Sequence, residues 1–441
     1  MYGASAIRLR EWDQRDIEHH ALGALSKTLA WALATVPIYE HARALAGEAL
    51  EEDPLAVLAK LPVLSKADYK SNLESYLSTR MPVASRLRMY TGGSTAEPMM
   101  FYLQKGVTRS REYAFMEDFR ARAGIREDDL VLTLRGHNVP SAARPGGKLW
   151  MYEPIKRQLI VSSDHLAPRY MRNYEDVLRR FRPRYVEAYP SAIYALSLWL
   201  HHHPIPEFTD QVRGVLLYSE NVYDHQLRLI REIFGCPVLR HYGHSERVIM
   251  AGTLPDDDRY YFWPQYGYFE LLSPSGAPIT KPGQLGEIVG TSFDNLVMPF
   301  VRYRTGDMAF LSDRPSKLPG YPVVERIEGR LQEFVITRDY RLISVCSMGA
   351  AHFRDLSFLD AIQYEQREPG HLVLKYVSSR PLDESERRKI RVAVEEKTQH
   401  GCAVDLIQVN SIPRTRRGKQ IMMVQHVDIE RHLQVMQAAV M

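Results

Sequence analysis

Cysteine is scarce in this sequence: Cys236, Cys346 and Cys402 are the only three among 441 residues. Their odd number and wide spacing predict neither the disulfide framework of a small secreted domain nor a CxxC zinc site. We therefore expect a chain that folds without disulfides and without zinc. A reducing cytoplasm is the simplest location for such a protein.

An excess of charge of one sign is also missing. The 57 lysine and arginine residues face 53 aspartate and glutamate residues, which leaves a net charge of +4. A protein that binds nucleic acid by neutralising phosphates needs a larger basic excess. Nucleic acid is therefore not an expected partner.

A long uninterrupted apolar run is the third missing feature. The most apolar N-terminal segment, residues 21–39, contains Lys27 and follows several acidic residues, so it predicts neither a signal peptide nor a membrane span. Leu22, Leu25 and Leu29 follow helical spacing and predict a buried or half-buried helix instead. The hydrophobic content of 45% is typical of a packed globular protein. Its length favours two or three folded units.

The predicted elements change character along the chain. Residues 1–82 look helical, with Ser65 as a predicted helix cap. Two short strands, 88–90 and 100–103, flank a polar loop and predict a hairpin. Beyond it, strands and helices alternate, which predicts an α/β fold with a parallel sheet covered by helices. The expected helices are 107–123, 170–181, 191–202 and 223–234, and the expected strands are 129–134, 158–163, 184–189, 214–219 and 237–243.

The last part of the chain has shorter elements. Residues 259–310 are rich in predicted strands and indicate a smaller β subdomain. After Gly329 the pattern begins again with short strands, a helix near 347–357 and a charged helix, which is typical of an α+β domain of about 110 residues. We therefore place a domain boundary near residue 330.

Five polar motifs stand out, and the first is a loop of small residues between the hairpin strands. In Thr91, Gly92, Gly93, Ser94 and Thr95, the glycines let backbone N–H groups approach a phosphate and the hydroxyls add donors. The loop is not a Walker motif, because it lacks the lysine and the following helix. The alternative is an ordinary glycine-rich hairpin turn.

The second motif, residues 242–246, directly follows a predicted strand. Ligands of parallel sheets gather beyond the carboxyl ends of the strands, so the carboxylate of Glu246 is well placed to bind Mg²⁺. A surface acid in a loop is the alternative.

The remaining three motifs lie in the second half of the chain. Asp307 follows a glycine turn and is suited to accept hydrogen bonds from both hydroxyls of a ribose. Arg330 lies at the predicted domain junction. Lys419 ends a basic run at 414–419, whose alternative interpretation is a solvated face.

In their order and spacing these motifs resemble the adenylate-forming superfamily of acyl-CoA synthetases. The resemblance is greatest to its phenylacetate-CoA ligase branch, which includes CapK-like proteins associated with capsule biosynthesis. It covers nearly the whole chain, and residues 36–39 and 61–66 look like the opening segments of that branch. It implies a large N-terminal adenylation domain, 1–330, and a small mobile C-terminal domain, 331–441.

The resemblance also implies a role for each matching residue. The catalytic residues would be Lys419 at the acyl-adenylate, Glu246 at magnesium and Arg330 beside the ribose. Gln332 and Glu333 would form the hinge of the small domain. The residues that bind the nucleotide would be Thr91, Gly92, Gly93, Ser94 and Thr95 at the phosphates, Ser219, Glu220, Asn221, His241, Tyr242 and Gly243 at the adenine, and Asp307 at the ribose.

The acid substrate is expected at the ends of two predicted strands. Tyr189, Pro190 and Ser191 follow one strand, and His137 follows another, so both segments lie where substrates bind in parallel sheets. Each is alternatively a simple turn.

Two segments depart from the pattern of the family. Ala96, Glu97 and Pro98 replace the usual TGKP ending of the phosphate loop, and Gln332 replaces the usual hinge aspartate. The loss of a positive charge at Glu97 predicts a weaker contact with pyrophosphate.

The motifs and the resemblance together predict an AMP-forming acid ligase. It would use ATP and Mg²⁺ to convert a carboxylic acid to an acyl-adenylate, and then pass the acyl group to coenzyme A, an amine or a sugar-linked group. Two alternatives stay open: an adenylyltransferase that leaves AMP on its substrate, and a nucleotide-binding protein that has lost catalysis. The oligomeric state also stays open, with a homodimer among the options.

Overall fold

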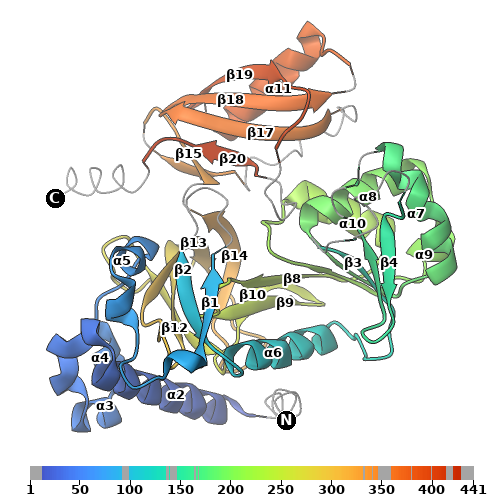
Figure 1. Cartoon of the computed structure of the whole chain (residues 1–441). Coiled ribbons are helices and arrows are strands. Elements are labelled where there is room, and N and C mark those ends of the chain that lie inside the picture. The colour runs from blue at the N-terminus through green and yellow to red at the C-terminus, as the bar shows by residue number, and fades with distance from the viewer. Residues whose placement is uncertain are drawn as a thin grey trace. The chain divides into compact units, whose positions relative to one another are not determined.

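The computed structural model describes residues 12–91, 99–135, 139, 147–162, 165–166, 168–330, 333–339, 341–345, 359–378, 380–398, 400–413 and 421–428. The chain forms two compact units, each made of two segments (Figure 1). Unit 1 comprises Met1–Arg126 and Leu239–Ile327, and unit 2 comprises Glu127–Val238 and Glu328–Met441. The boundary near residue 330 stays a prediction.

Unit 1 begins with short helices around one long helix, α2 (Gln14–Thr35), which buries Leu25 and Leu29 as the leucine spacing predicts, whereas Leu22 is exposed. Ser65 caps the short helix α5 (Lys66–Ser71) in a capping box with Asp68, so the predicted cap is confirmed. The others are η2 (Pro37–Leu45), α3 (Glu48–Glu52), α4 (Pro54–Ala59), η3 (Leu73–Tyr76) and η4 (Val83–Ser85).

No single helix among the described residues is both long enough and apolar enough to cross a membrane. Helices α2 and η2 satisfy that length and composition only as a pair, and they meet at a bend of 118°.

The rest of unit 1 is mainly antiparallel. The predicted hairpin is confirmed as β1 (Arg86–Tyr90) and β2 (Met100–Gln104), followed by α6 (Thr108–Arg122). Seven further strands lie in the order β11-β12-β13-β14-β10-β9-β8. They are β8 (Val238–Gly243), β9 (Met250–Leu254), β10 (Asp257–Phe262), β11 (Gly267–Leu272), β12 (Leu285–Ser292), β13 (Tyr303–Leu311) and β14 (Val323–Arg330).

Unit 2 contains the predicted parallel sheet, with neighbours in the order β7-β6-β3-β5-β4. Its strands are β3 (Val131–Leu134), β4 (Trp150–Glu153), β5 (Gln158–Val161), β6 (Tyr185–Ala188) and β7 (Gly214–Leu217). Strand β4 pairs antiparallel with β5 and was not predicted, because its four residues follow a proline- and glycine-rich stretch without a strand pattern. The helices are α7 (Pro168–Phe181), α8 (Pro190–His202), α9 (Pro206–Thr209) and α10 (Asp224–Phe234).

The C-terminal segment of unit 2 has its own sheet and core. A four-stranded sheet, β19-β18-β17-β20, carries α11, and its buried side chains include Tyr364, Leu374 and Ile390 (Figure 1). The predicted helix near 347–357 lies outside the described residues. The elements are β15 (Phe334–Ile336), β16 (Leu342–Ser344), β17 (Leu359–Glu368), β18 (His371–Ser378), α11 (Glu384–Lys397), β19 (Ala403–Gln408) and β20 (Met423–Gln425).

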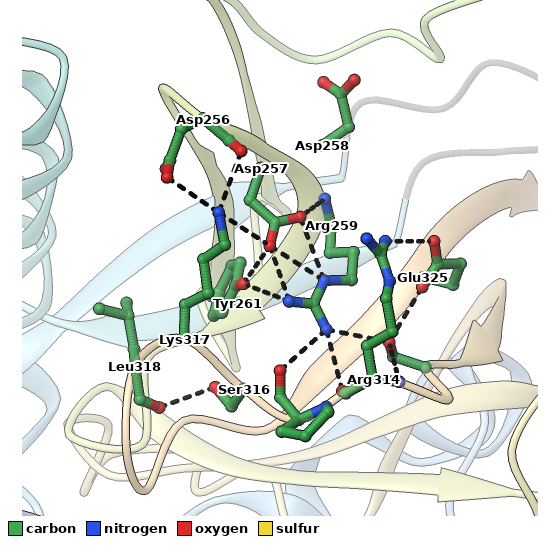
Figure 2. A network of polar contacts seen from close by, with 12 residues as sticks. Asp256, Asp257, Asp258, Arg259, Tyr261, Arg314, Ser316, Lys317, Leu318 and Glu325 are labelled. Atoms are coloured by element: carbon green, nitrogen blue, oxygen red, sulfur yellow. Dashed lines mark hydrogen bonds and ion pairs between the residues drawn. The ribbon is translucent and has the colours of Figure 1, made fainter.

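A buried ion pair in β10 is joined by hydrogen bonds to the loop at residues 314–315 of unit 1, as Figure 2 shows. The Arg259 guanidinium donates to both carboxylate oxygens of Asp257 and also to the backbone oxygens of Arg314 and Pro315. Tyr261 donates a further hydrogen bond to the same carboxylate, at 2.7 Å. Burial raises the pKa of Asp257, but the bonds from Arg259 and Tyr261 outweigh it and hold that pKa below its usual range.

Candidate active site

Two residues predicted to bind the nucleotide meet in unit 1. The Tyr242 hydroxyl, near the end of β8, donates to Oδ2 of Asp307 in β13 at 2.8 Å. Gly306, with φ of +77°, precedes Asp307 where the β12–β13 register shifts, and its N–H donates to Glu287. This irregular strand, with its left-handed glycine, sets the backbone position of Asp307.

Glu246 lies a few residues beyond Tyr242 and is almost fully buried. Its Oε1 accepts a hydrogen bond from the Tyr303 hydroxyl at 2.7 Å. Glu246 forms no ion pair with any residue in the described part of the chain. Its negative charge is therefore oriented by a neutral phenol and is not neutralised by a protein cation.

His244 lies between Tyr242 and Glu246 in the sequence, and its ring is in contact with Tyr242 and Tyr303 at centroid distances of 5.9 Å and 6.4 Å. Both ring nitrogens are buried, and neither has a hydrogen-bond partner within the described ranges. Buried polar groups without a protein partner commonly form their hydrogen bonds with a ligand or a water molecule.

His241 and Gly243 are held closely by their surroundings. The His241 ring contacts Phe119 at a centroid distance of 5.6 Å. A Cβ on Gly243 would meet that ring at 2.9 Å, so a larger residue would force the histidine to move. Glycine at this position is required by the close approach.

Thr91 closes the neck of the predicted phosphate loop. Its backbone N–H donates to the Met99 carbonyl at 2.9 Å, and its hydroxyl accepts from the Met99 N–H at 2.9 Å. Gly92, Gly93, Ser94 and Thr95 lie outside the described residues, so their predicted role stays a prediction.

Arg247, the residue after Glu246, belongs to a group of charged side chains that are partly or fully buried. Arg247, at φ of +56°, lies 3.9 Å from Glu112 on α6, and neighbouring Arg111 pairs with Asp294. Burial, opposed by the nearby Arg111 charge and assisted by Glu112, raises the pKa of Asp294 to about 7. This acid is therefore unusually ready to hold a proton near neutral pH.

In unit 2 the structure brings together the predicted adenine segment and the predicted acid segment. The Glu220 carboxylate accepts from the Ser191 N–H at 2.9 Å and from its hydroxyl at 3.1 Å. Ser191 is in the first turn of α8, so Glu220 satisfies a helix N-terminus. Ser219 adopts a left-handed φ of +66°, which turns the chain toward this contact. Tyr189 and Pro190 open the same helix and are buried.

The adenine segment also contacts the predicted hinge. Asn221 donates from its amide nitrogen to the Glu333 carboxylate. Gly329, at φ of +87°, lies so close that a Cβ there would overlap the Asn221 side chain. Both contacts lie within unit 2, and they join residues more than 100 positions apart in the sequence.

Several predicted residues are not tested by the structure. The side chain of Arg330 is not described, although its backbone ends β14. His137, Gln332 and Lys419 lie outside the described residues.

Tyr303 is the site residue that sequence reasoning missed. It precedes Asp307 by four positions in the same motif, and its hydroxyl holds Glu246. The only available signal was an aromatic residue inside a polar strand, which is usually a core residue. Its buried ring fits that interpretation, and only the hydroxyl reveals its second role.

A magnesium ion fits the donor set around Glu246. No cluster of three or more histidine, cysteine or acidic side chains suited to a metal occurs within the described ranges. Mg²⁺ is commonly held by one carboxylate together with water and substrate phosphates, so a single glutamate is sufficient.

Comparison with known proteins gives two informative relatives. Protein CapK of Staphylococcus aureus is 23% identical over 373 residues, which are 83% of this chain and 80% of that protein. Phenylacetate-coenzyme A ligase of Pseudomonas putida is 25% identical over 330 residues, which are 73% of this chain and 72% of that protein. No family model matches the sequence.

Solved structures support the fold. A 2-hydroxyisobutyryl-CoA ligase in its postadenylation state, in complex with R3-HIB-AMP, has a TM-score of 0.66 at 18% identity, covering 95% of this chain and 91% of that one. The acyl acid amido synthetase AtGH3.15 has a TM-score of 0.62 at 13% identity, covering 98% and 96%. The predicted α/β fold is confirmed. These relatives agree with the ordered motifs: the chain is similar over most of its length to CapK and to phenylacetate-coenzyme A ligases, which supports its resemblance to that branch of the adenylate-forming superfamily.

Proposed function

We propose that this protein activates a carboxylic acid with ATP as an acyl-adenylate, releases pyrophosphate, and then transfers the acyl group to a second substrate. Its class, an AMP-forming acid ligase, is the class of its phenylacetate-coenzyme A ligase relatives. The observation that carries the proposal is the hydrogen bond between Tyr242 and Asp307, because it joins two separate motifs predicted to bind one nucleotide.

In the first step, a carboxylate oxygen of the acid attacks the α-phosphorus of ATP, and the bond from that phosphorus to pyrophosphate breaks. Two anions must meet, so positive charge and positioning matter more than a general base. Mg²⁺ bound at Glu246 would supply charge neutralisation at the phosphates. Asp307 would fix the ribose, and Tyr242 orients Asp307.

Lys419 is proposed to complete this step. Its ammonium group would donate to the oxygens that gain charge as the acyl-adenylate forms. Arg330 would lie beside the ribose, in line with the family resemblance.

For the second step, we propose that residues 331–441 turn about Gln332 and Glu333 so that the acceptor can reach the acyl carbonyl. The bond between Asn221 and Glu333 would then link the hinge to the segment beside the adenine. The acceptor is proposed to be coenzyme A or an amine, because one relative is a phenylacetate-coenzyme A ligase and one structural neighbour is an acyl acid amido synthetase. A sugar-linked acceptor in polysaccharide synthesis is a further option suggested by CapK.

The proposal is tested by exchange of labelled pyrophosphate into ATP in the presence of aryl, fatty, amino and uronic acids. We expect exchange with at least one class. Lys419→Ala should reduce it about 100-fold or more, whereas Lys397→Ala, an exposed lysine on α11, should not.

Absence of exchange with every acid would contradict the proposal and favour a nucleotide-binding protein without catalysis. A stable adenylylated product without free AMP would instead indicate an adenylyltransferase.

A further inference from the structure

A group of polar side chains lies where three neighbouring strands of the unit 2 sheet end. Glu187 is in β6, Arg135 follows β3 and Tyr218 follows β7. Each comes shortly before a segment with a predicted ligand-binding role: 189–191, 137 and 219–221. We call Arg135, Glu187, Tyr218 and Thr133 the strand-end cluster.

The sheet register places the strand-end cluster on one face. Thr133 pairs with Glu187, and Glu187 pairs with Leu216, in parallel register. Side chains two positions apart point to the same face, so Arg135 shares the face of Thr133, and Tyr218 shares the face of Leu216. Backbone bonds continue past the strands, from the Tyr189 N–H to Leu134 and from the Tyr218 N–H to Ala188.

The contacts within the cluster are charged. The Arg135 guanidinium lies 4.5 Å from the centre of the Tyr218 ring, and one of its nitrogens lies 3.4 Å from the Glu187 carboxylate. The Tyr218 hydroxyl approaches the other oxygen of that carboxylate at 3.5 Å. The guanidinium is thus fixed by a ring and an acid on the scaffold of a rigid sheet.

Burial decides which member a ligand can reach. Glu187, Tyr218 and Thr133 are 1%, 3% and 0% exposed, whereas the Arg135 side chain is 30% exposed. The buried Thr133 hydroxyl has no hydrogen-bond partner among the described residues, which is a second sign of an incomplete polar site. Arg135 is therefore the member of the strand-end cluster that a ligand can reach, and its charge is balanced by Glu187.

We propose that Arg135 is a specificity-determining residue and that the strand-end cluster selects carboxylic acids carrying hydroxyl groups. Guanidinium N–H groups donate to hydroxyl oxygens. A hydrocarbon chain or a plain phenyl ring bound there would cover the guanidinium and remove its hydrogen bonds to water without forming new ones, which is unfavourable. Because Glu187 balances the charge of Arg135, we expect the site to bind neutral hydroxyl oxygens rather than a second carboxylate of the substrate. The inference rests on the proposed function and names its substrate class.

The test uses pyrophosphate exchange with pairs of acids that share a skeleton: gluconate with hexanoate, mandelate with phenylacetate, and 3-hydroxybutyrate with butyrate. For at least one pair, we expect kcat/KM of the full-length protein to be about tenfold or more higher for the hydroxylated member. Arg135→Met should reduce that preference about tenfold, because kcat/KM falls for the hydroxylated acid and stays unchanged for its partner.

Arg184→Met is the matched control. Arg184 lies 3.4 Å from Asp129 at the opposite end of the same strands, so its loss removes a similar ion pair away from the cluster. It should leave the preference unchanged, and thermal unfolding of both variants checks that they fold.

Three outcomes are decisive. A wild-type preference for the hydrocarbon acids would overturn the inference and leave the proposed function intact. An equal loss for both members of a pair in Arg135→Met would show that the arginine only supports the fold, and would also overturn it. No exchange by the wild type with any acid would overturn the proposed function itself.

Discussion

Asp257 and Glu246, two of the buried carboxylates of unit 1, have contrasting surroundings. Asp257 is neutralised by Arg259, and that guanidinium also donates to neighbouring backbone carbonyls (Figure 2). Glu246 is equally buried but accepts its hydrogen bond from the neutral Tyr303 hydroxyl. The first carboxylate has a cation supplied by the protein. The second has none among the described residues, which is the state expected of a group that binds a cation from outside.

The comparison separates structural from functional acids by their partners and not by their burial. It predicts that changes at Asp257 act mainly on stability, whereas changes at Glu246 act mainly on the reaction. Two substitutions test this separation directly, and two more, at Asp294 and Tyr242, sharpen it at neighbouring polar groups of unit 1.

Asp257→Asn should have the largest effect, and on stability. It leaves the Arg259 guanidinium buried without a counter-charge, which costs about 3 kcal/mol of unfolding free energy. Urea denaturation measures this loss. At a temperature where the variant stays folded, pyrophosphate exchange should remain near the wild-type rate. A variant as stable as the wild type would contradict the structural role of Asp257.

Glu246→Gln should show the reverse pattern. Loss of the charge removes the proposed magnesium ligand, so exchange should fall about 100-fold, while the urea midpoint changes little. Titration with Mg²⁺ should show that higher concentrations are needed for the remaining activity. Full exchange at ordinary Mg²⁺ would remove Glu246 from the site.

Asp294→Asn should change how stability depends on pH. The folded pKa of Asp294 is raised to about 7, so the folded state binds a proton more tightly than the unfolded state does. Its contribution to stability is present below the unfolded pKa of about 4 and is lost as pH rises towards 7. Relative to the Asn variant, the wild type should lose about 1 kcal/mol between pH 6 and pH 7. If the unfolding free energies of the wild type and the variant changed equally with pH, this prediction would be wrong.

Tyr242→Phe should have the smallest effect. It removes one hydrogen bond to Asp307, so the KM for ATP should rise about threefold with little change in kcat. Tyr260→Phe, a buried tyrosine of the same unit, is a control that should leave KM unchanged.

Local patterns predicted the parts of the fold that depend on neighbouring residues. The Ser65 cap, the hairpin before α6 and the alternation of strands and helices from β3 to β8 all follow from short sequence patterns and are confirmed. Strand β4 was missed because four residues without clear alternation carry too weak a pattern.

The site was predicted less completely, since its contacts join distant residues. The motifs predicted that Tyr242 and Asp307 serve one nucleotide, but their direct hydrogen bond spans 65 positions and depends on strand register. The Arg135 and Glu187 pair was not predicted for the same reason: each residue is unremarkable in its own strand, and only parallel pairing brings them together.

The most direct test of the central claim follows an oxygen atom. An acid active in exchange is labelled with ¹⁸O in its carboxylate and incubated with ATP and its acceptor, and the released AMP is analysed by mass spectrometry. If an acyl-adenylate forms, one carboxylate oxygen stays on phosphorus when the acceptor attacks the acyl carbon, so AMP should carry one ¹⁸O. AMP without label, or label found only in another phosphate product, would contradict the account.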